Sequence, residues 1–277
     1  MQQQFDFSGK VVFIAGGTSG INLGVAHGFA QAGAAVAVMS RSQDKVDAAL
    51  AALKAHGGEV FGVAADVRDY AGTEAAFKAA QAALGKFDVL ISGAAGNFPA
   101  PALGMSANAF KSVIDIDLLG TYHVLRAAFP LLKKPGASIV NISAPQAFIP
   151  MEFQMHVCAA KAGVDMCTRV AAMEWGAAGV RVNSVTPGPI EGTEGMKRLA
   201  PDQATRQLVT DSVPLGHFGT PDDIAQACLW LSSPLARYVT GVVLPVDGGW
   251  SLGGVSSSGA GMKQAFASGG KSATAKP

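Results

Sequence analysis

Residues 11–22, VVFIAGGTSGIN, decide the fold of this chain. An apolar run of the kind found in strands buried on both faces leads into a glycine-rich turn, and a helical pattern follows the turn. In such a unit the glycines let backbone N–H groups and the helix N-terminus approach a pyrophosphate. The stretch therefore predicts a dinucleotide-binding site at Gly16, Thr18, Ser19, Gly20 and Ile21.

Asn22 departs from the usual dinucleotide-binding turn. It takes the place of the third glycine, the one that allows close packing of helix on strand. Asn adopts the left-handed region more readily than other non-glycine residues. We therefore expect the turn to keep its shape with Asn22 in that conformation.

Strand-like and helical patterns alternate along the rest of the chain. The expected strands are 10–15, 35–40, 60–64, 89–92, 138–143, 180–186 and 242–246, and the expected helices are 23–32, 43–56, 70–84, 107–132, 155–178 and 222–232. Thr220 is the expected N-cap of the last helix. Repeated βαβ units give a parallel sheet with helices on both faces. We expect one α/β domain over 1–252, a Rossmann-type doubly wound sheet of about seven strands, and a Ser/Gly-rich tail over 253–277.

Composition excludes several classes of protein. The formal net charge is +1, which supplies no field for holding nucleic acid or an anionic membrane. The 3 cysteines form no CxxC pair, so we expect neither a disulfide framework nor a metal site. No apolar stretch is long enough to cross a bilayer, and residues 1–7 lack the pattern of a signal peptide. We expect a cytoplasmic protein.

The end of the second strand bears on the choice of dinucleotide. An NAD site calls for a carboxylate there, whereas this chain has Ser40 and Arg41. A hydroxyl and a guanidinium suit a 2′-phosphate, which a carboxylate would repel. The sequence therefore favours NADP(H) as cofactor.

Several motifs, in order, resemble those of the short-chain dehydrogenase/reductase family over most of the chain. They are Asp66-Val67 after the third strand, SGAAG at 92–96, PGPI at 187–190 and DGG at 247–249. The resemblance implies further cofactor contacts at Asp66, Val67, Ala94, Ala95, Gly96, Lys161, Pro187, Gly188, Ile190 and Thr193.

The catalytic positions depart from that family. Its usual serine, tyrosine, lysine and asparagine correspond here to Ala144, Val157, Lys161 and Asp117. Reduction of a ketone needs a proton donor at the carbonyl oxygen, and valine supplies none. An ordinary alcohol–ketone reaction is therefore not expected.

One branch of the family lacks the tyrosine, and this chain is similar to it: the 2,4-dienoyl-CoA reductases, particularly the peroxisomal type. The similarity lies in AAGNF at 94–98, DID at 115–117, AKAGVD at 160–165, EWG at 174–176 and PGPIEGTEG at 187–195. It implies a bacterial-type relative that reduces a conjugated dienoyl or enoyl CoA thioester with NADPH and forms a homotetramer.

The chemistry of that branch assigns roles to the site residues. Hydride addition to the far carbon of the diene leaves a dienolate, which needs a donor at the thioester oxygen and a proton at the α-carbon. The resemblance implies that Asn97 donates to the oxygen and that Asp117 and Lys161 hold the water that delivers the proton. Asp165, one helical turn beyond Lys161, either positions the lysine or takes part in the reaction.

Substrate contacts are expected at Arg68, Asn97, Phe98 and Arg198, with the cations facing the phosphates of coenzyme A and a substrate loop over 190–213. Two other interpretations stay open at this point. The chain could reduce another activated alkene or a keto thioester. It could also be a catalytically silent NADP(H)-binding sensor or scaffold, as the lost serine and tyrosine would allow.

Overall fold

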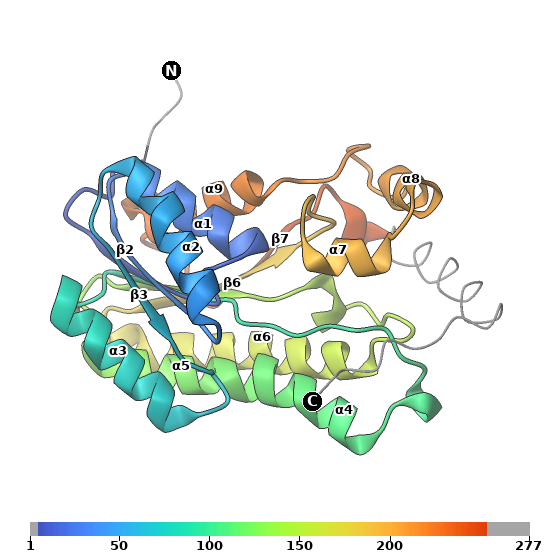
Figure 1. Ribbon diagram of the computed structural model, residues 1–277, viewed down its shortest axis with the longest axis horizontal. Helices are drawn as coiled ribbons and strands as arrows, with labels where there is room; N and C mark the ends of the chain where they lie inside the picture. Colours follow the sequence, from blue (N-terminus) through green and yellow to red (C-terminus); the bar gives the residue numbers. More distant parts are fainter. Residues whose placement is uncertain (1–4, 254–277) are drawn as a thin grey trace.

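The computed structural model describes residues 5–253 (Figure 1). Seven parallel strands form one sheet in the order β3-β2-β1-β4-β5-β6-β7. They are β1 Val11–Ala15, β2 Ala35–Ser40, β3 Val60–Ala64, β4 Val89–Ser92, β5 Ser138–Ile142, β6 Arg181–Pro187 and β7 Val243–Val246. The predicted doubly wound sheet is confirmed. The predicted tail lies, except for its first residue, outside the described residues.

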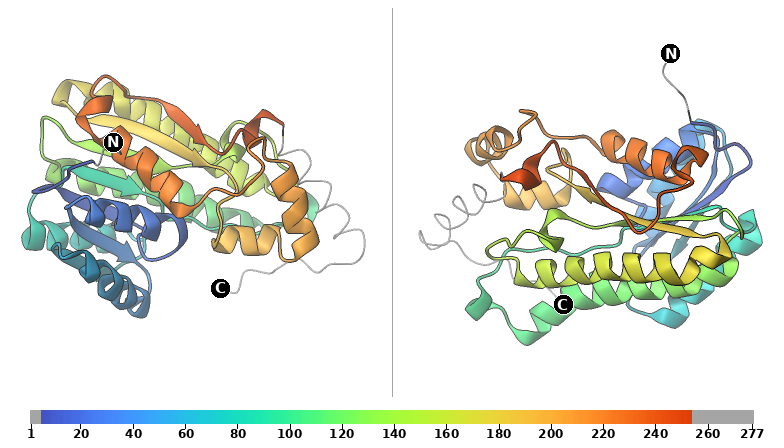
Figure 2. Two further views of the ribbon diagram at one scale, coloured as in Figure 1. Left: turned by 90° about the horizontal axis from the view of Figure 1, so that it is seen from above. Right: turned by 180° about the vertical axis from the view of Figure 1, so that it is seen from behind.

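Helices cover both faces of the sheet, as Figure 2 shows. One face carries α1 Gly20–Gln31, α2 Gln43–Leu53 and α9 Pro221–Ser232, and the other carries α3 Tyr70–Leu84, α5 Gly120–Ala128 and α6 Met155–Trp175. Alternate residues of β1 serve the two cores: Val12 and Ile14 pack on the first face, and Phe13 on the second. Burial on both faces is the reason that the strand is apolar throughout.

The strand order reverses between β1 and β4, because β2 and β3 lie on one side of β1 while β4 to β7 lie on the other. In open parallel sheets a ligand binds outside the carboxyl ends of the strands at such a point. The predicted cofactor residues other than Lys161, which lies in α6, are at or soon after the carboxyl ends of β1, β2, β3, β4 and β6. The topology therefore gathers them at one edge of the sheet.

The helix expected over 107–132 is present, but its hydrogen-bond pattern changes along its length. It consists of α4 Ala107–Val113, a π-helical segment Ile114–Leu119 and α5, and a short 3₁₀ turn follows. The Gly120 N–H donates to Asp115 O, which is the wider i→i−5 bond of a π-helix. Such segments concentrate at functional sites, and this one contains Asp117. Two other helices differ at their ends, since α1 begins at Gly20 and α2 gives way to a 3₁₀ turn after Leu53.

The stretch expected to be a substrate loop, 190–213, contains two helices. They are α7 Glu194–Leu199 and α8 Gln203–Asp211, which lie together beyond one end of the sheet (Figures 1 and 2). Each begins at a polar cap: Thr193 accepts from Met196 N, and Asp202 accepts from Thr205 N. Capping of this kind satisfies backbone donors that short helices leave free. The predicted N-cap of α9, Thr220, is confirmed, and it forms a capping box with Asp223.

The contact between α1 and α9 is close enough to require a glycine. A Cβ at Gly24 would overlap the ring of Pro221. We expect Gly24→Ala to lower the free energy of unfolding by about 1–3 kcal/mol, the usual cost of overpacking, as measured by denaturant titration. Gly176→Ala is the control, because a Cβ there meets nothing within 4 Å and the backbone is helical. Equal stabilities of the two variants would contradict this packing.

Within residues 5–253, no helix combines the length and apolar character needed to cross a membrane. The same residues hold no group of three or more His, Cys, Asp or Glu placed around a common metal position. Cys158, Cys167 and Cys228 are all free thiols.

Candidate active site

The turn between β1 and α1 is built to receive an anion. Gly16 has a φ of 79°, and a Cβ there would lie 2.9 Å from the backbone N and Cα of Ala94. Gly20 has a φ of 53° at the start of α1. Ser19 makes no side-chain cap, and the first turn of the helix carries no acidic residue. The N–H groups of this turn are therefore available to a pyrophosphate, so the residues fit a dinucleotide.

Asn22 is not in the left-handed region, contrary to the expectation from the motif. It lies in the first turn of α1, where a helical backbone is required by the bonds of that helix. Its Nδ2 donates to Gly93 O at 2.7 Å, and a Cβ at Gly93 would overlap its amide. A hydrogen bond between α1 and the end of β4 thus replaces the close packing of a third glycine.

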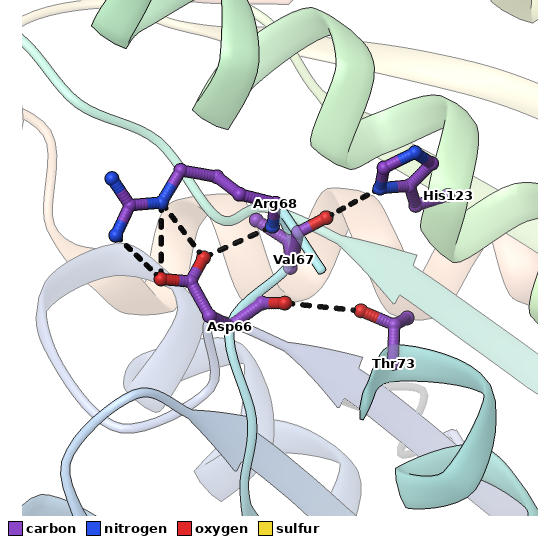
Figure 3. Close-up of polar contacts among 5 residues, drawn as sticks. All are labelled: Asp66, Val67, Arg68, Thr73 and His123. Atoms are coloured by element: carbon purple, nitrogen blue, oxygen red, sulfur yellow. Dashed lines mark hydrogen bonds and ion pairs between the residues drawn. The ribbon is translucent and has the colours of Figure 1, made fainter. Parts of the chain in front are cut away.

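Asp66 and Arg68 form one ion pair beyond the end of β3 (Figure 3). The carboxylate of Asp66 accepts from Arg68 Nη2 at 2.6 Å and from its Nε at 3.0 and 3.1 Å. Burial raises the pKa of Asp66, but the hydrogen bonds and charge of Arg68, with the charge of Arg41, hold it below its usual value. Val67 O is bonded to the ring of His123 at 2.8 Å. Arg68 is therefore paired with Asp66, and its side chain is 45% exposed at the carboxyl edge of the sheet.

A buried ion pair joins Asp117 to Lys161. The Lys161 Nζ lies 3.3 Å from Asp117 Oδ2, and the two side chains are 7% and 1% exposed. Asp117 Oδ1 accepts from Gly96 N at 2.7 Å, and Lys161 Nζ donates to Ile142 O at 3.0 Å. Burial raises the pKa of Asp117, while the Lys161 ammonium and the Gly96 N–H act in the opposite direction. The predicted pair is thus brought into direct contact by the π-helical segment and α6.

Asp165 does not make the ion pair with Lys161. Its Oδ1 accepts from Ser184 Oγ at 2.9 Å, and the residue is buried. Burial raises the pKa of Asp165, against the hydrogen bonds of nearby hydroxyls and the charges of Lys161 and Arg169. The structure therefore binds Asp165 to β6 through Ser184, close enough to Lys161 for the two charges to interact.

The position of the usual tyrosine is filled by an apolar side chain. Val157 is buried in a small cluster with Phe98 and Ala160. The neighbouring His156 is buried too, with its ring centroid 4.4 Å from that of Phe98. Burial lowers the pKa of His156, and the backbone of Phe98 raises it slightly. Val157 gives the site no proton donor, whereas Asp117 and Lys161 place two charged groups there.

Two predicted substrate residues meet across a long sequence separation. Arg198, in α7, donates from Nη1 to Asn97 O at 2.6 Å.

Thr193 fixes the start of α7, since its hydroxyl donates to Ile190 O at 2.9 Å. Ile190 is buried beside Gly219 in an isolated bridge. At the end of β6, a Cβ at Gly188 would lie 2.6 Å from Asp247 Cα, so the DGG turn packs directly on the PGPI turn.

Sequence reasoning missed a buried amide pair before α6. Gln146 Nε2 donates to Gln154 Oε1 at 2.9 Å, and both side chains are buried. Phe153 has a φ of 64°, a strained conformation for an aromatic residue, and its carbonyl accepts from Ala100 N at 2.8 Å. The signal available was two glutamines in a largely apolar stretch between Ala144 and Val157, which also contains Glu152 and His156.

Comparisons with known proteins place the chain in a family of reductases. Residues 15–251 match the family model described as enoyl-(acyl carrier protein) reductase. The chain is 44% identical over 242 residues to the peroxisomal 2,4-dienoyl-CoA reductase, (3E)-enoyl-CoA-producing, of Rattus norvegicus, covering 87% of this chain and 83% of the rat protein. It is 37% identical over 243 residues to the probable 2,4-dienoyl-CoA reductase, (2E)-enoyl-CoA-producing, of Bacillus subtilis, covering 87% of this chain and 96% of that protein.

A solved structure is similar as well. An NADPH-bound short-chain oxidoreductase of Pseudomonas aeruginosa PAO1, which contains an atypical catalytic center, superimposes with a TM-score of 0.83 at 32% identity. The match covers 88% of this chain and 98% of that one. The fold is therefore one that binds a nicotinamide cofactor.

Proposed function

Because the chain belongs to the short-chain dehydrogenase/reductase family, we propose that it uses NADPH to reduce the conjugated double bonds of a 2,4-dienoyl-CoA thioester. It is an oxidoreductase similar to the dienoyl-CoA reductases. The observation that carries the proposal is the buried Asp117–Lys161 pair beside a valine at the tyrosine position. That arrangement retains a charged group that can handle a proton and omits the donor that a ketone requires.

The residues present fit a nicotinamide dinucleotide. The Gly16 turn and the first N–H groups of α1 would hold the pyrophosphate, and Asp66 and Val67 would contact the adenine. Lys161 would hold the ribose next to the nicotinamide. When bound, this cofactor supplies the hydride.

Ser40 and Arg41 support NADPH over NADH, because no carboxylate stands at the end of β2. We expect NADPH to bind more tightly than NADH and Arg41→Ala to remove most of that preference. A hydrogen bond to a charged group is worth about 1.5–3 kcal/mol, so the ratio of dissociation constants should change by about 10- to 150-fold. Fluorescence titration of the unaltered protein and the variant with NADPH and with NADH gives these dissociation constants. Equal affinities in the unaltered protein would contradict the assignment.

The chain's own residues supply what the reaction of a dienoyl thioester needs after hydride reaches the far carbon of the diene. The electrons of the two double bonds move toward the carbonyl and give a dienolate with its charge on the thioester oxygen. In this proposal the amide of Asn97 donates a hydrogen bond to that oxygen. A water held by Asp117 and Lys161 then protonates the α-carbon, which leaves a 3-enoyl thioester.

Turnover of a short 2,4-dienoyl-CoA with NADPH tests the proposal. The absorbances of the cofactor and of the conjugated thioester should fall together, and one mole of NADPH should be consumed for each mole of thioester. A panel of acyclic ketones should react far more slowly, because Val157 cannot protonate a carbonyl oxygen. Ketones reduced as fast as the thioester would overturn the proposal, and so would cofactor binding without turnover of any thioester.

We also propose a homotetramer. Support comes from exposed apolar side chains along one stripe of α6, which are Met155, Met166, Val170 and Met173. Exposed apolar stripes of this kind mark surfaces that a partner covers. Light scattering after size-exclusion chromatography measures the mass, and a monomer would contradict the proposal.

A further inference from the structure

A continuous series of polar contacts runs from Lys161 to helix α7. The ammonium of Lys161 lies 3.3 Å from Asp117 Oδ2, and the other oxygen of Asp117 accepts from Gly96 N at 2.7 Å. The next residue, Asn97, has its carbonyl oxygen 2.6 Å from Arg198 Nη1. The Gly96–Asn97 segment is therefore held by a carboxylate on one side and by a guanidinium on the other.

Helix α7 belongs to the segment 191–218, which we call the lid. Its two ends meet at the bridge between Ile190 and Gly219, where Glu191 N donates to Gly219 O at 2.8 Å. Its last part is anchored to the body, since Trp250 Nε1 donates to Ser212 Oγ at 3.0 Å. Arg198 adds a third point of attachment, from α7 to the loop after β4.

The neighbouring cation of α7 makes a different contact. Lys197 Nζ pairs with Glu194 Oε1 at 2.7 Å, within the helix, and its side chain is 66% exposed. The two adjacent residues thus carry the same charge from the same helix, but only the Arg198 contact reaches the active site. This difference supplies a matched control.

We infer that Arg198 is a positioning residue that couples the lid to Asn97. By fixing the carbonyl of Asn97 it holds the Gly96–Asn97 segment against Asp117, and so orients the Asn97 amide for the thioester oxygen. The inference rests on the proposed function for the role of Asn97, but the coupling itself does not depend on turnover. A planar guanidinium suits this task, because its donors keep a fixed geometry.

A rival role for Arg198 is direct binding of a phosphate of coenzyme A. The two roles differ in what the substrate must contain. A phosphate contact matters only for substrates that carry the nucleotide part of coenzyme A. A contact to Asn97 O matters equally for a dienoyl thioester of pantetheine, which has no nucleotide.

Amide hydrogen exchange measures the coupling without substrate. The Gly96 amide is the reporter, because its bond is to Asp117 and not to Arg198. Loss of a charge-assisted hydrogen bond should speed its exchange by about tenfold in Arg198→Gln. Lys197→Gln should leave it unchanged. Equal exchange rates in Arg198→Gln and the unaltered protein would overturn the inference.

Kinetics separate the two roles. In Arg198→Gln, kcat/KM should fall by about tenfold for dienoyl-CoA and by the same factor for dienoyl-pantetheine. Arg198→Lys should recover part of the loss. A loss confined to dienoyl-CoA would assign Arg198 to phosphate binding and overturn the inference. If the unaltered protein turns over neither thioester, the proposed function fails, while the exchange rates still decide the coupling.

Discussion

Asp117→Ala is expected to lower kcat for a dienoyl thioester by about 10²–10⁴, the usual span for loss of general acid–base catalysis. The affinity for NADPH should stay nearly unchanged, since Asp117 is not itself an expected cofactor contact, although it bonds to two residues that are, Lys161 and Gly96. Stopped-flow turnover and a cofactor titration give the two quantities. Asp117→Asn guards against a folding defect, because it keeps an acceptor for the Gly96 N–H.

The pH dependence of kcat adds a second test of Asp117. Its pKa is raised by burial, and the pair with Lys161 exists only while the carboxyl is ionised. Activity should therefore be present above that raised pKa and be lost as the pH falls through it. Asp117→Asn should lack this acid limb. Asp115→Ala is the control, since Asp115 pairs with Lys111 on the outside of the same stretch. Full activity of Asp117→Ala would remove this residue from the mechanism and make Asp165 the next carboxylate to test.

Lys161→Ala is expected to lower kcat by about the same factor and, unlike Asp117→Ala, to weaken NADPH binding as well. The double variant should be little slower than the slower single variant, because residues that act as one unit are strongly non-additive. Lys111→Ala, which removes an exposed lysine from an ion pair on the outer side of the same helical stretch, is the control. If the fall in kcat of the double variant equals the product of the two single falls, the two residues act independently, which would contradict this prediction.

The sheet could be predicted from the sequence because its strands are buried on both faces. Residues 35–40, 60–64 and 89–92 form strands with the expected bounds. Three others differ by one residue at one end, and the sixth strand is shifted by one residue at both ends. The π-helical segment Ile114–Leu119 could not be predicted, since the apolar pattern continues through it while the hydrogen bonds widen. Helices α7 and α8 were missed because their residues are largely polar and their short lengths give little periodicity.

The candidate site was predicted unevenly for a similar reason. Sequence motifs located Asp117, Lys161 and Asn97, because each lies in a stretch that resembles a known branch of the family. Contacts between distant segments were not predictable, as Arg198 and Asn97 are separated by 101 positions. The substrate contact of Arg68 stays a prediction, and its ion pair with Asp66, two residues away, was not foreseen.

The most direct test of the account follows two hydrogens into the product. The protein is supplied with a short 2,4-dienoyl-CoA, first with NADPH deuterated at the transferable position in ordinary water, and then with unlabelled NADPH in D₂O. Mass spectrometry and NMR of the product should place the cofactor's deuterium on the far carbon of the former diene and the solvent's deuterium on the α-carbon. Cofactor deuterium on the carbonyl carbon, or solvent deuterium on any other carbon, would contradict a site that protonates a dienolate through Asp117 and Lys161.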